Sequence, residues 1–382
     1  MWNAVAANSI GRGCGAIVMR KRNKTRQVRA GGLAIGGDAP VSIQSMTNIP
    51  VERVPETIDQ IRKLERLGCQ LVRIALRNVE AAESLARVVP AVTIPVCADV
   101  HFDYRIAVAA IEAGAHKVRI NPGNIGDERG VREVIAAARD RGVPIRIGVN
   151  GGSVNRRRYP EVNPDSLAAS ALEHVRILED NAFDAIVVSI KSSDIIQTIE
   201  ANRKFTSQRD YPVHIGLTEA GYGVTCIVQS SVALGCLLME GIGDTLRVSM
   251  TGDPAEEIIV ARTILESAGE RKARIRIVSC PTCGRTDTGL DILELARAVD
   301  REATARFEKI MQDTDRSLHV AIMGCEVNGP GEARDADAGL AGIRDGRLLL
   351  FAKGEKLRVV SQEEAVPALM EELRKIIDRD FR

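Results

Sequence analysis

One strand–helix unit repeats eight times between residues 40 and 254, and this repeat limits the fold more than any other feature. In each unit a short apolar strand ends in polar or glycine residues, and an amphipathic helix such as 55–64 follows. The predicted strands are 41–46, 71–75, 94–99, 117–121, 144–150, 185–191, 213–219 and 245–249. This alternation predicts an α/β fold, a (β/α)8 TIM barrel. An open doubly wound sheet is the alternative, but no GxGxxG motif follows the first strand.

Four arginines occupy equivalent positions in these strands, each flanked by aliphatic residues: Arg73, Arg119, Arg146 and Arg247. Side chains alternate between the two faces of a strand, so arginines face the barrel interior if the aliphatic residues face the helices. Further polar residues share the inward direction and lie toward the carboxyl ends of the strands. They are Asn121, Asn150, Ser189, Lys191, Thr218 and Ser249.

Buried arginines are costly unless they are paired, so this inward set predicts an anionic ligand. Asp99 and Glu219 can neutralise some of the arginines but not all of them. Arginine binds phosphate oxygens through two parallel hydrogen bonds, which makes a phosphorylated substrate the simplest expectation. The alternative is that individual arginines form salt bridges between elements of the fold.

Residues 269–382 are predicted to form a second, small α+β domain, after a barrel domain over 29–268 and a poorly ordered head over 1–28. Strands are expected at 274–279 and 318–323, and helices at 291–313 and 363–378. Between them, residues 340–360 predict two or three antiparallel strands around the turns Asp345-Gly346 and Lys353-Gly354.

Three cysteines of this domain form the clearest metal motif of the sequence. Cys280 and Cys283 are spaced as CxxC, and Cys325 lies in a second glycine-rich turn. Three thiolates without a matching fourth fit an iron–sulfur cluster with one unusual ligand, and Glu332 is the nearby oxygen donor. A carboxylate on iron is exchangeable, which would free one iron for a substrate oxygen. The alternatives are a zinc knuckle or a redox dithiol.

Composition excludes several other classes of function. The formal net charge of +1 argues against a nucleic-acid surface, and 3% aromatic residues argue against a base-stacking platform. Eight cysteines in 382 residues are too few for a disulfide scaffold and indicate a reducing, cytoplasmic location. No apolar run reaches the length of a membrane span, and residues 1–28 have the wrong order of features for a secretory signal.

Eight longer motifs resemble one known family. They are 39–48, 98–107, 119–126, 144–150, 217–221, 240–249, 280–283 and 324–332, and they cover the chain from about residue 25 to 345. The sequence is similar to the 4-hydroxy-3-methylbut-2-enyl diphosphate synthases of the methylerythritol phosphate pathway to isoprenoids, in their bacterial two-domain type. Ile49 and residues 222–226 depart from the family pattern at the expected rim of the site.

The resemblance implies a reductive ring opening and dehydration. The substrate would be 2-C-methyl-D-erythritol 2,4-cyclodiphosphate, and the product 4-hydroxy-3-methylbut-2-enyl diphosphate. The two electrons would pass singly through a [4Fe-4S] cluster held by Cys280, Cys283, Cys325 and Glu332, from flavodoxin or ferredoxin. The family also implies a homodimer in which one subunit's cluster domain caps the partner's barrel. The alternative is that the cluster domain closes over the barrel of its own chain.

The resemblance also implies roles for single residues. Arg73, Arg119, Arg146, Lys191 and Arg247 would bind the diphosphate, with Asn150, Thr218 and Ser249 beside them. Asp99, Glu219 and Asn328 would face the reacting carbons, with Glu219 as the proton donor. Two other classes of function remain as alternatives. One is a phosphate-binding barrel lyase or transferase of the pteroate-synthase type with a structural zinc tail, and the other is an iron–sulfur sensor without catalysis.

Overall fold

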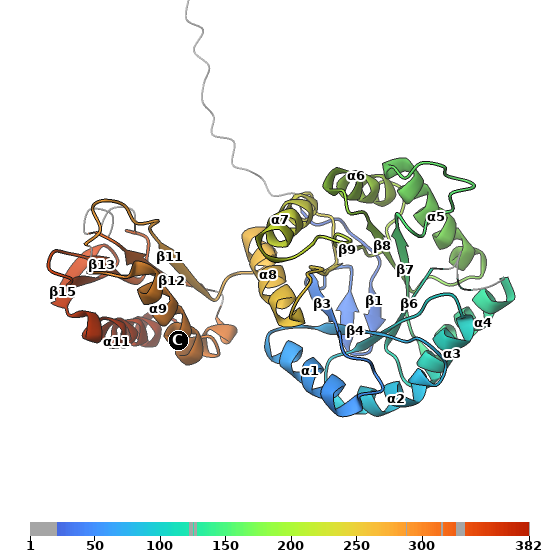
Figure 1. Cartoon of the computed structure of the whole chain (residues 1–382), viewed down its shortest axis with the longest axis horizontal. Helices are drawn as coiled ribbons and strands as arrows, with labels where there is room; N and C mark the ends of the chain where they lie inside the picture. The colour runs from blue at the N-terminus through green and yellow to red at the C-terminus, as the bar shows by residue number, and fades with distance from the viewer. Residues whose placement is uncertain are drawn as a thin grey trace, which may run out of the picture. The chain divides into compact units, whose positions relative to one another are not determined.

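The computed structural model describes residues 21–121, 125, 128–287, 289–314, 316–325 and 333–381. The chain divides into two compact units, one ending at Arg271 and the other beginning at Lys272 (Figure 1). Across the described residues, no helix is both long and apolar enough to cross a membrane.

The first unit is built on one eight-stranded parallel sheet with neighbour order β8-β7-β6-β5-β4-β3-β10-β9. A parallel bridge between Val188 and Val213 joins the β8 and β9 ends of this order, so the sheet is nearly closed. The strands are β3 Ser42–Met46, β4 Leu71–Ala75, β5 Val96–Asp99, β6 Lys117–Ile120, β7 Ile145–Asn150, β8 Ile186–Lys191, β9 His214–Ile215 and β10 Thr245–Leu246. The predicted TIM barrel is therefore confirmed.

Two strands are much shorter than predicted, since β9 and β10 are regular over only two residues each. The chain at Gly216, just after β9, approaches its neighbours too closely for a side chain. A Cβ atom there would lie 2.5 Å from Lys191 Nζ and 2.7 Å from the carbonyl oxygen of Arg247. Regular strand hydrogen bonding therefore ends at Ile215, and the chain continues close to the side chain of Lys191.

A helix follows each barrel strand, and the helices surround the sheet in Figure 1. They are α1 Val54–Arg66, α2 Ala81–Val88, α3 Tyr104–Glu112, α4 Glu128–Arg141, α5 Pro164–Asp180, α6 Ile195–Thr206, α7 Gly223–Met239 and α8 Pro254–Ser267, with a 3-10 turn η1 Val89–Ala91 after α2. Side-chain N-caps such as Asp103 and Asp194 fix where helices start, because their carboxylates accept free backbone N–H groups. Aliphatic residues of the strands pack against the helices in one large core.

The amino-terminal end of the barrel is closed by a hairpin of β1 Val28–Ala30 and β2 Leu33–Ile35. Its residues are buried together with Leu71, Cys97 and Val187. The preceding segment is also attached, because Thr25 Oγ1 donates to Asp244 at 2.8 Å and Arg26 pairs with Asp210 at 2.9 Å. Residues 21–28 are therefore ordered, contrary to the expectation of a disordered head over 1–28; residues 1–20 of that head lie outside the described part.

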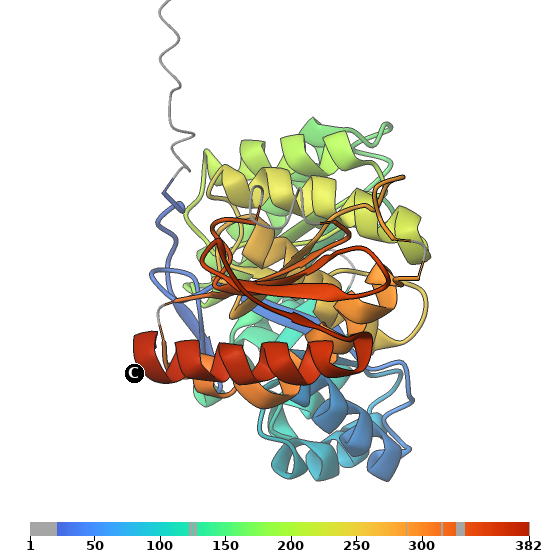
Figure 2. The same cartoon turned by 90° about the vertical axis from the view of Figure 1, so that its left-hand side faces the viewer.

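The second unit is an α+β structure around a five-stranded sheet with order β11-β12-β13-β14-β15. Strands β11 to β13 run parallel, and β13 to β15 pair antiparallel. The elements are β11 Ile275–Ser279, α9 Ile292–Phe307, η2 Ile310–Asp313, β12 Leu318–Met323, β13 Ala338–Gly342, β14 Leu348–Ala352, β15 Glu355–Val360 and α11 Gln362–Asp380. Apolar residues of α9 and α11 form one core with the sheet, along which α11 runs in Figure 2.

Both hairpin turns of this sheet fall where the sequence predicts them. Asp345 and Gly346 have φ values of 61° and 65°, and Lys353 and Gly354 have φ values of 50° and 80°. Two successive residues with positive φ form the tight turns that match the twist of antiparallel strands. The remaining predicted elements of the unit occur with small shifts at their ends.

Candidate active site

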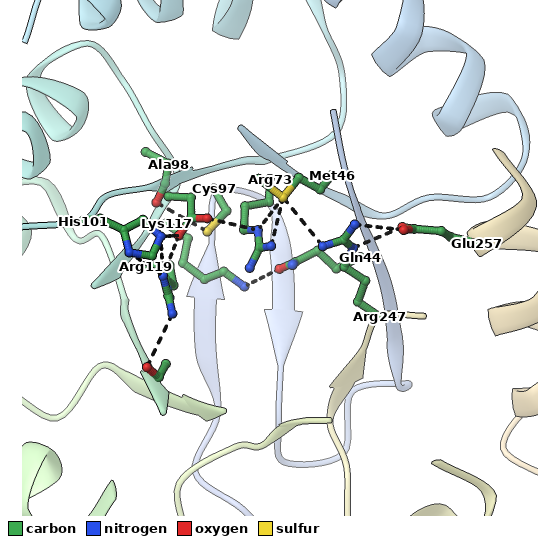
Figure 3. Close-up of polar contacts among 12 residues, drawn as sticks. Gln44, Met46, Arg73, Cys97, Ala98, His101, Lys117, Arg119, Arg247 and Glu257 are labelled. Carbon is green, nitrogen blue, oxygen red and sulfur yellow. Dashed lines mark hydrogen bonds and ion pairs between the residues drawn. The ribbon is translucent and has the colours of Figure 1, made fainter. Parts of the chain in front are cut away.

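Five basic residues that the strand pattern identified lie on or directly after the barrel strands. Arg73 is on β4, Arg119 on β6, Arg146 on β7 and Lys191 at the end of β8, while Arg247 follows β10. Figure 3 shows Arg73, Arg119 and Arg247 gathered with Lys117 inside the sheet. Arg146 is only 1% exposed. The predicted inward direction of the arginines is therefore borne out by the structure.

Two carboxylates pair with three of these arginines. Arg119 Nη1 lies 3.2 Å from Asp99 Oδ1, and Arg73 Nε lies 3.6 Å from Asp99 Oδ2. Arg247 donates two hydrogen bonds to Glu257 of α8, at 2.8 and 3.1 Å. The sequence interpretation allowed Glu219 a share of this neutralisation, and no ion pair of Glu219 occurs among the described residues. Glu257 supplies the second carboxylate, because α8 packs against β3, the strand that pairs with β10 in the sheet.

The remaining basic groups are poorly compensated, and Arg146 and Lys191 have no acidic partner among the described residues, while Arg73 has only a long contact with Asp99. Arg146 Nε and Nη1 are buried without any hydrogen-bond partner in that part of the chain. Arg73 donates to the sulfur of Met46, a weak acceptor, at 3.2 and 2.9 Å. A buried positive charge without a partner is unfavourable, and a ligand that brings negative charge would relieve it.

The pKa values of the site follow from this excess of positive charge. Burial alone would raise the pKa of the Asp99 carboxyl, but Arg73, His101 and Arg119 outweigh that effect and hold it well below its usual range. Burial, reinforced by Arg146 and Arg73, lowers the pKa of Lys191 well below its ordinary value. Asp99 is therefore a carboxylate at neutral pH, and an anion bound beside Lys191 would favour its ammonium form.

Two cavities open at the carboxyl ends of the strands, and Asn150 lines both. One, of about 470 Å³, also has Thr218 and Glu219 in its wall. The other, of about 280 Å³, is lined by His101, Arg119 and Asn121. Neither polar atom of the Asn121 amide has a partner in the described chain, although both are buried. These side chains are positioned to bind polar groups of a ligand at the barrel mouth.

Glu219 projects from the loop after β9 and is exposed. Its φ of +58° is uncommon for a residue other than glycine and indicates a constrained backbone. Ser249 is half-buried after β10, and its carbonyl oxygen accepts a hydrogen bond from the Cys226 thiol at 3.5 Å. The predicted residues Asn328 and Glu332 lie outside the described residues.

A larger cavity of about 920 Å³ lies at the opposite, amino-terminal end of the barrel. Its wall includes Arg203, which contacts Glu240, and Arg26, which pairs with Asp210. Active sites of TIM barrels lie at the carboxyl ends of the strands. The cationic interior, rather than this larger cavity, is therefore the candidate site.

Sequence reasoning missed four residues of the site: Gln44, His101, Lys117 and Glu257. Lys117 was detectable, because it stands two positions before Arg119 in the same strand and therefore faces the same way. His101 Nε2 accepts a hydrogen bond from Arg119 Nη1 at 2.7 Å, from a loop position that no strand pattern covers. Glu257 is on a helix, where its inward direction depends on how the helix packs.

In the second unit, two of the three motif cysteines lie just beyond the carboxyl ends of the neighbouring strands β11 and β12. Ile322 of β12 is in register with Ser279 of β11, so the strands end side by side. Cys280 follows β11, and its sulfur accepts a hydrogen bond from the backbone N–H of Gly324 at 3.0 Å. Cys325 is the next residue and is buried. The parallel pairing thus unites cysteines that are 45 positions apart in the sequence.

Cys283 of the same motif is exposed, and hydrogen bonds from the backbone and side chain of Arg285 lower the pKa of its thiol. A lower pKa favours the thiolate, which is the form that binds metals. No three Cys, His, Asp or Glu side chains converge as a ligand set within the described residues. The three sulfur donors nevertheless fit an iron–sulfur group by their chemistry, because soft thiolates are its usual ligands.

The fold and the site together define a TIM-barrel protein with a cationic interior and a cysteine-bearing second unit. A family model described as the GcpE TIM-barrel domain matches residues 25–262. Another, described as the GcpE protein C-terminal domain, matches residues 276–375. The chain belongs to the GcpE family, and the family resemblance seen in the sequence motifs is confirmed.

Its relatives are named 4-hydroxy-3-methylbut-2-en-1-yl diphosphate synthase (flavodoxin). The protein of Clostridium acetobutylicum is 46% identical over 356 residues, which cover 92% of this chain and 99% of the relative. That of Symbiobacterium thermophilum is 48% identical, covering 92% and 93%. That of Geobacter sulfurreducens is 47% identical over 357 residues, covering 93% and 98%.

Solved structures similar to this chain include the dihydropteroate synthase of Yersinia pestis. It has a TM-score of 0.47 and 10% sequence identity, over 64% of this chain and 98% of that one. The dihydropteroate synthase of Stenotrophomonas maltophilia has a TM-score of 0.48 at 13% identity, over 63% and 98%. The pteroate-synthase alternative gains no support from likeness at this level.

Proposed function

We propose that this protein is an iron–sulfur oxidoreductase that converts 2-C-methyl-D-erythritol 2,4-cyclodiphosphate to 4-hydroxy-3-methylbut-2-enyl diphosphate. Relatives at 46% identity over nearly their whole length carry the name of this synthase. The observation that carries the proposal is the unpaired charge of the barrel interior. Arg146 and Lys191 have no acidic partner among the described residues, and a cyclic diphosphate supplies two negative charges.

The diphosphate would lie against Arg73, Arg119, Arg146, Lys191 and Arg247. Guanidinium groups bind phosphate oxygens in pairs of parallel hydrogen bonds, and their number fixes the orientation of the ring. Asn150, Thr218 and Ser249 would hydrogen-bond the remaining oxygens at the mouth. The carbon skeleton would then point outward, toward the rim where Glu219 lies.

The reaction breaks the carbon–oxygen bond that closes the ring and expels a hydroxyl group as water, while two electrons enter the carbon skeleton. The departing oxygen needs a proton. Glu219 is the residue at the mouth that could supply it, since its carboxyl group is not committed to an ion pair in the described part of the barrel. Asp99 is ionised by its arginine partners and would orient them instead.

Cys280, Cys283 and Cys325 would hold an iron–sulfur cluster, with Glu332 as the fourth ligand of a [4Fe-4S] group. When bound, this group supplies electrons one at a time. Gly324 supports the arrangement, because its N–H already donates to Cys280 sulfur and such hydrogen bonds tune cluster potentials. Flavodoxin is the expected electron donor, with ferredoxin as the alternative. The proposal includes a homodimer whose cluster domain caps the partner's barrel.

Anaerobic purification followed by iron and sulfide analysis and a turnover assay tests the function. Cys283→Ser should lose cluster iron and activity, because a hydroxyl is a poor substitute for a thiolate ligand. Cys236→Ser is the matched control, since Cys236 is also exposed but lies on α7. The wild type should convert the cyclic diphosphate with reduced flavodoxin or a chemical reductant. Zinc in place of iron, or no product from iron-loaded protein, would reject the assignment.

A further inference from the structure

Lys117 is a lysine that the proposed chemistry does not use, and it lies in the centre of the barrel. It is the first residue of β6, and its side chain is 0% exposed. Its neighbour across the sheet is Cys97 of β5, which belongs to the core around the closing hairpin. Arg119 follows two positions later in the same strand. Lys117 therefore lies one layer below the residues expected to bind the diphosphate.

The surroundings of Lys117 do not compensate a positive charge. Within the described residues, the hydrogen-bond partner of its Nζ atom is the amide oxygen of Gln44, at 3.4 Å (Figure 3). The charged or titratable side chains that act on its charge are Cys97, Arg146 and Arg73, and Lys117 in turn acts on His214. Asp99, a carboxylate of the same interior, already pairs with Arg73 and Arg119.

Charge balance indicates which groups relieve the excess. If all ionised, six basic side chains and two carboxylates among the described interior residues would leave four uncompensated positive charges. The six basic side chains are Arg73, Lys117, Arg119, Arg146, Lys191 and Arg247, and the two carboxylates are Asp99 and Glu257. A cyclic diphosphate brings two negative charges. Guanidinium groups keep their proton in proteins, so the two amines are the groups that can be neutral before a ligand arrives.

We propose that Lys117 is neutral in the ligand-free protein and takes up a proton from solvent when the anionic substrate binds in the layer above it. Lys117 is then a positioning residue, which places a positive charge beneath the diphosphate without contacting it. The identity of the dianion rests on the proposed function. Burial, the largest effect, and the charges of Arg146 and Arg73 lower the pKa of Lys117 to about 7, in agreement with a neutral amine above that pH.

Proton uptake can be measured by titration calorimetry with the cyclic diphosphate at pH 8, in HEPES and in Tris. At that pH roughly nine in ten Lys117 side chains are neutral if the pKa is about 7. The ligand is a diester of diphosphate without an acid group that titrates nearby. The binding heat of the wild type should therefore differ between the two buffers, because each buffer ionises with its own enthalpy when it gives up a proton.

Two variants assign the proton. Lys117→Met keeps the length of the side chain and should reduce uptake by about one proton, whereas Lys191→Met should leave the Lys117 contribution in place. Gln44→Glu gives Lys117 a carboxylate partner, so Lys117 should be charged before binding and its uptake should disappear. Equal binding heats in both buffers for the wild type, or undiminished uptake in Lys117→Met, would overturn the proposal.

A second measurement does not depend on the ligand. A lysine whose pKa is lowered by folding makes the free energy of unfolding rise with pH between the folded pKa, about 7, and the unfolded value near 10.5. The unfolding constant should fall about tenfold per pH unit in the steep part of this range, and Lys117→Met should lack that part of the pH dependence. An identical pH dependence in the two proteins would mean that Lys117 is charged in the ligand-free state. If the wild type bound no cyclic diphosphate, the proposed function would fail while this test still decided the state of Lys117.

Discussion

Arg146 and Arg247 should respond in opposite ways to the same substitution. Arg146 is 1% exposed, and its Nε and Nη1 atoms have no partner among the described residues. Arg247 instead donates two hydrogen bonds to Glu257, which is 2% exposed. Methionine approximates the length of either side chain and carries no charge. Arg146→Met therefore removes an uncompensated charge, whereas Arg247→Met leaves a buried carboxylate without its partner.

The two variants should change the free energy of unfolding in opposite directions, but both should weaken binding of the cyclic diphosphate. Replacing a buried charged group by an apolar one of similar volume is often neutral or stabilises by about 1–4 kcal/mol. Removing one partner of a buried pair destabilises by about 3–5 kcal/mol. Glu257 keeps hydrogen bonds from Ser45 at 2.8 Å and from the backbone of Met250 at 3.2 Å, so the loss belongs at the lower end. Both variants should bind the cyclic diphosphate roughly 30-fold to several thousand-fold more weakly.

Urea unfolding of the ligand-free proteins and calorimetric titration with the cyclic diphosphate measure the two effects. The dependence of unfolding free energy on urea should be unchanged, so that a shifted midpoint reports stability. The two ligand-free proteins should move apart, with Arg146→Met at or above the wild type and Arg247→Met below it. Equal destabilisation of both, or wild-type affinity in Arg146→Met, would refute the view that Arg146 is kept for a ligand at the expense of stability.

Two further predictions concern the carboxylates. Glu219→Gln should keep wild-type stability and near-normal affinity while single-turnover rates of reduced enzyme fall about 100- to 10,000-fold, the usual worth of a general acid; a wild-type rate would remove Glu219 from the mechanism. The folded state lowers the pKa of Asp99, so the stability that Asp99 contributes is present above its unfolded value near 3.8 and is lost as pH falls below it. Asp99→Asn should therefore be less stable than the wild type at pH 7, with a gap that closes in acid, and a gap independent of pH would contradict the ion pairs.

The barrel and the inward direction of its arginines were predictable because both depend on periodicity along the chain. Side chains alternate along a strand, so Arg119 faces inward and the next residue, Ile120, faces a helix. Four or five residues of a strand are enough to show this alternation. The turns at Gly346 and Gly354 were predictable because two successive positive φ values limit the residue choice. These are local properties, which a single sequence contains in full.

The partners of the arginines were not predictable, because they depend on packing between elements that are distant in sequence. Glu257 reaches Arg247 because α8 packs against β3, which pairs with β10, and the sequence of α8 does not tell which strand the helix covers. The shortness of β9 has the same origin, because Gly216 must make room for Lys191 from another strand. The alternation of side chains along a strand shows which face of the sheet a residue is on, but not which residues it contacts.

The assignment of the proton donor follows from those partners rather than from the motif. Asp99 and Glu219 are both carboxyl groups at the carboxyl ends of barrel strands, and the strand pattern gives no reason to prefer one, although the family resemblance favours Glu219. Asp99 is buried between Arg73 and Arg119, which stabilise its ionised form, so protonating it would break two ion pairs. Glu219 is exposed at the mouth and is not held in an ion pair by any described residue. A general acid must regain its proton in every cycle, and of the two groups Glu219 is the one that can do so without dismantling the anion site.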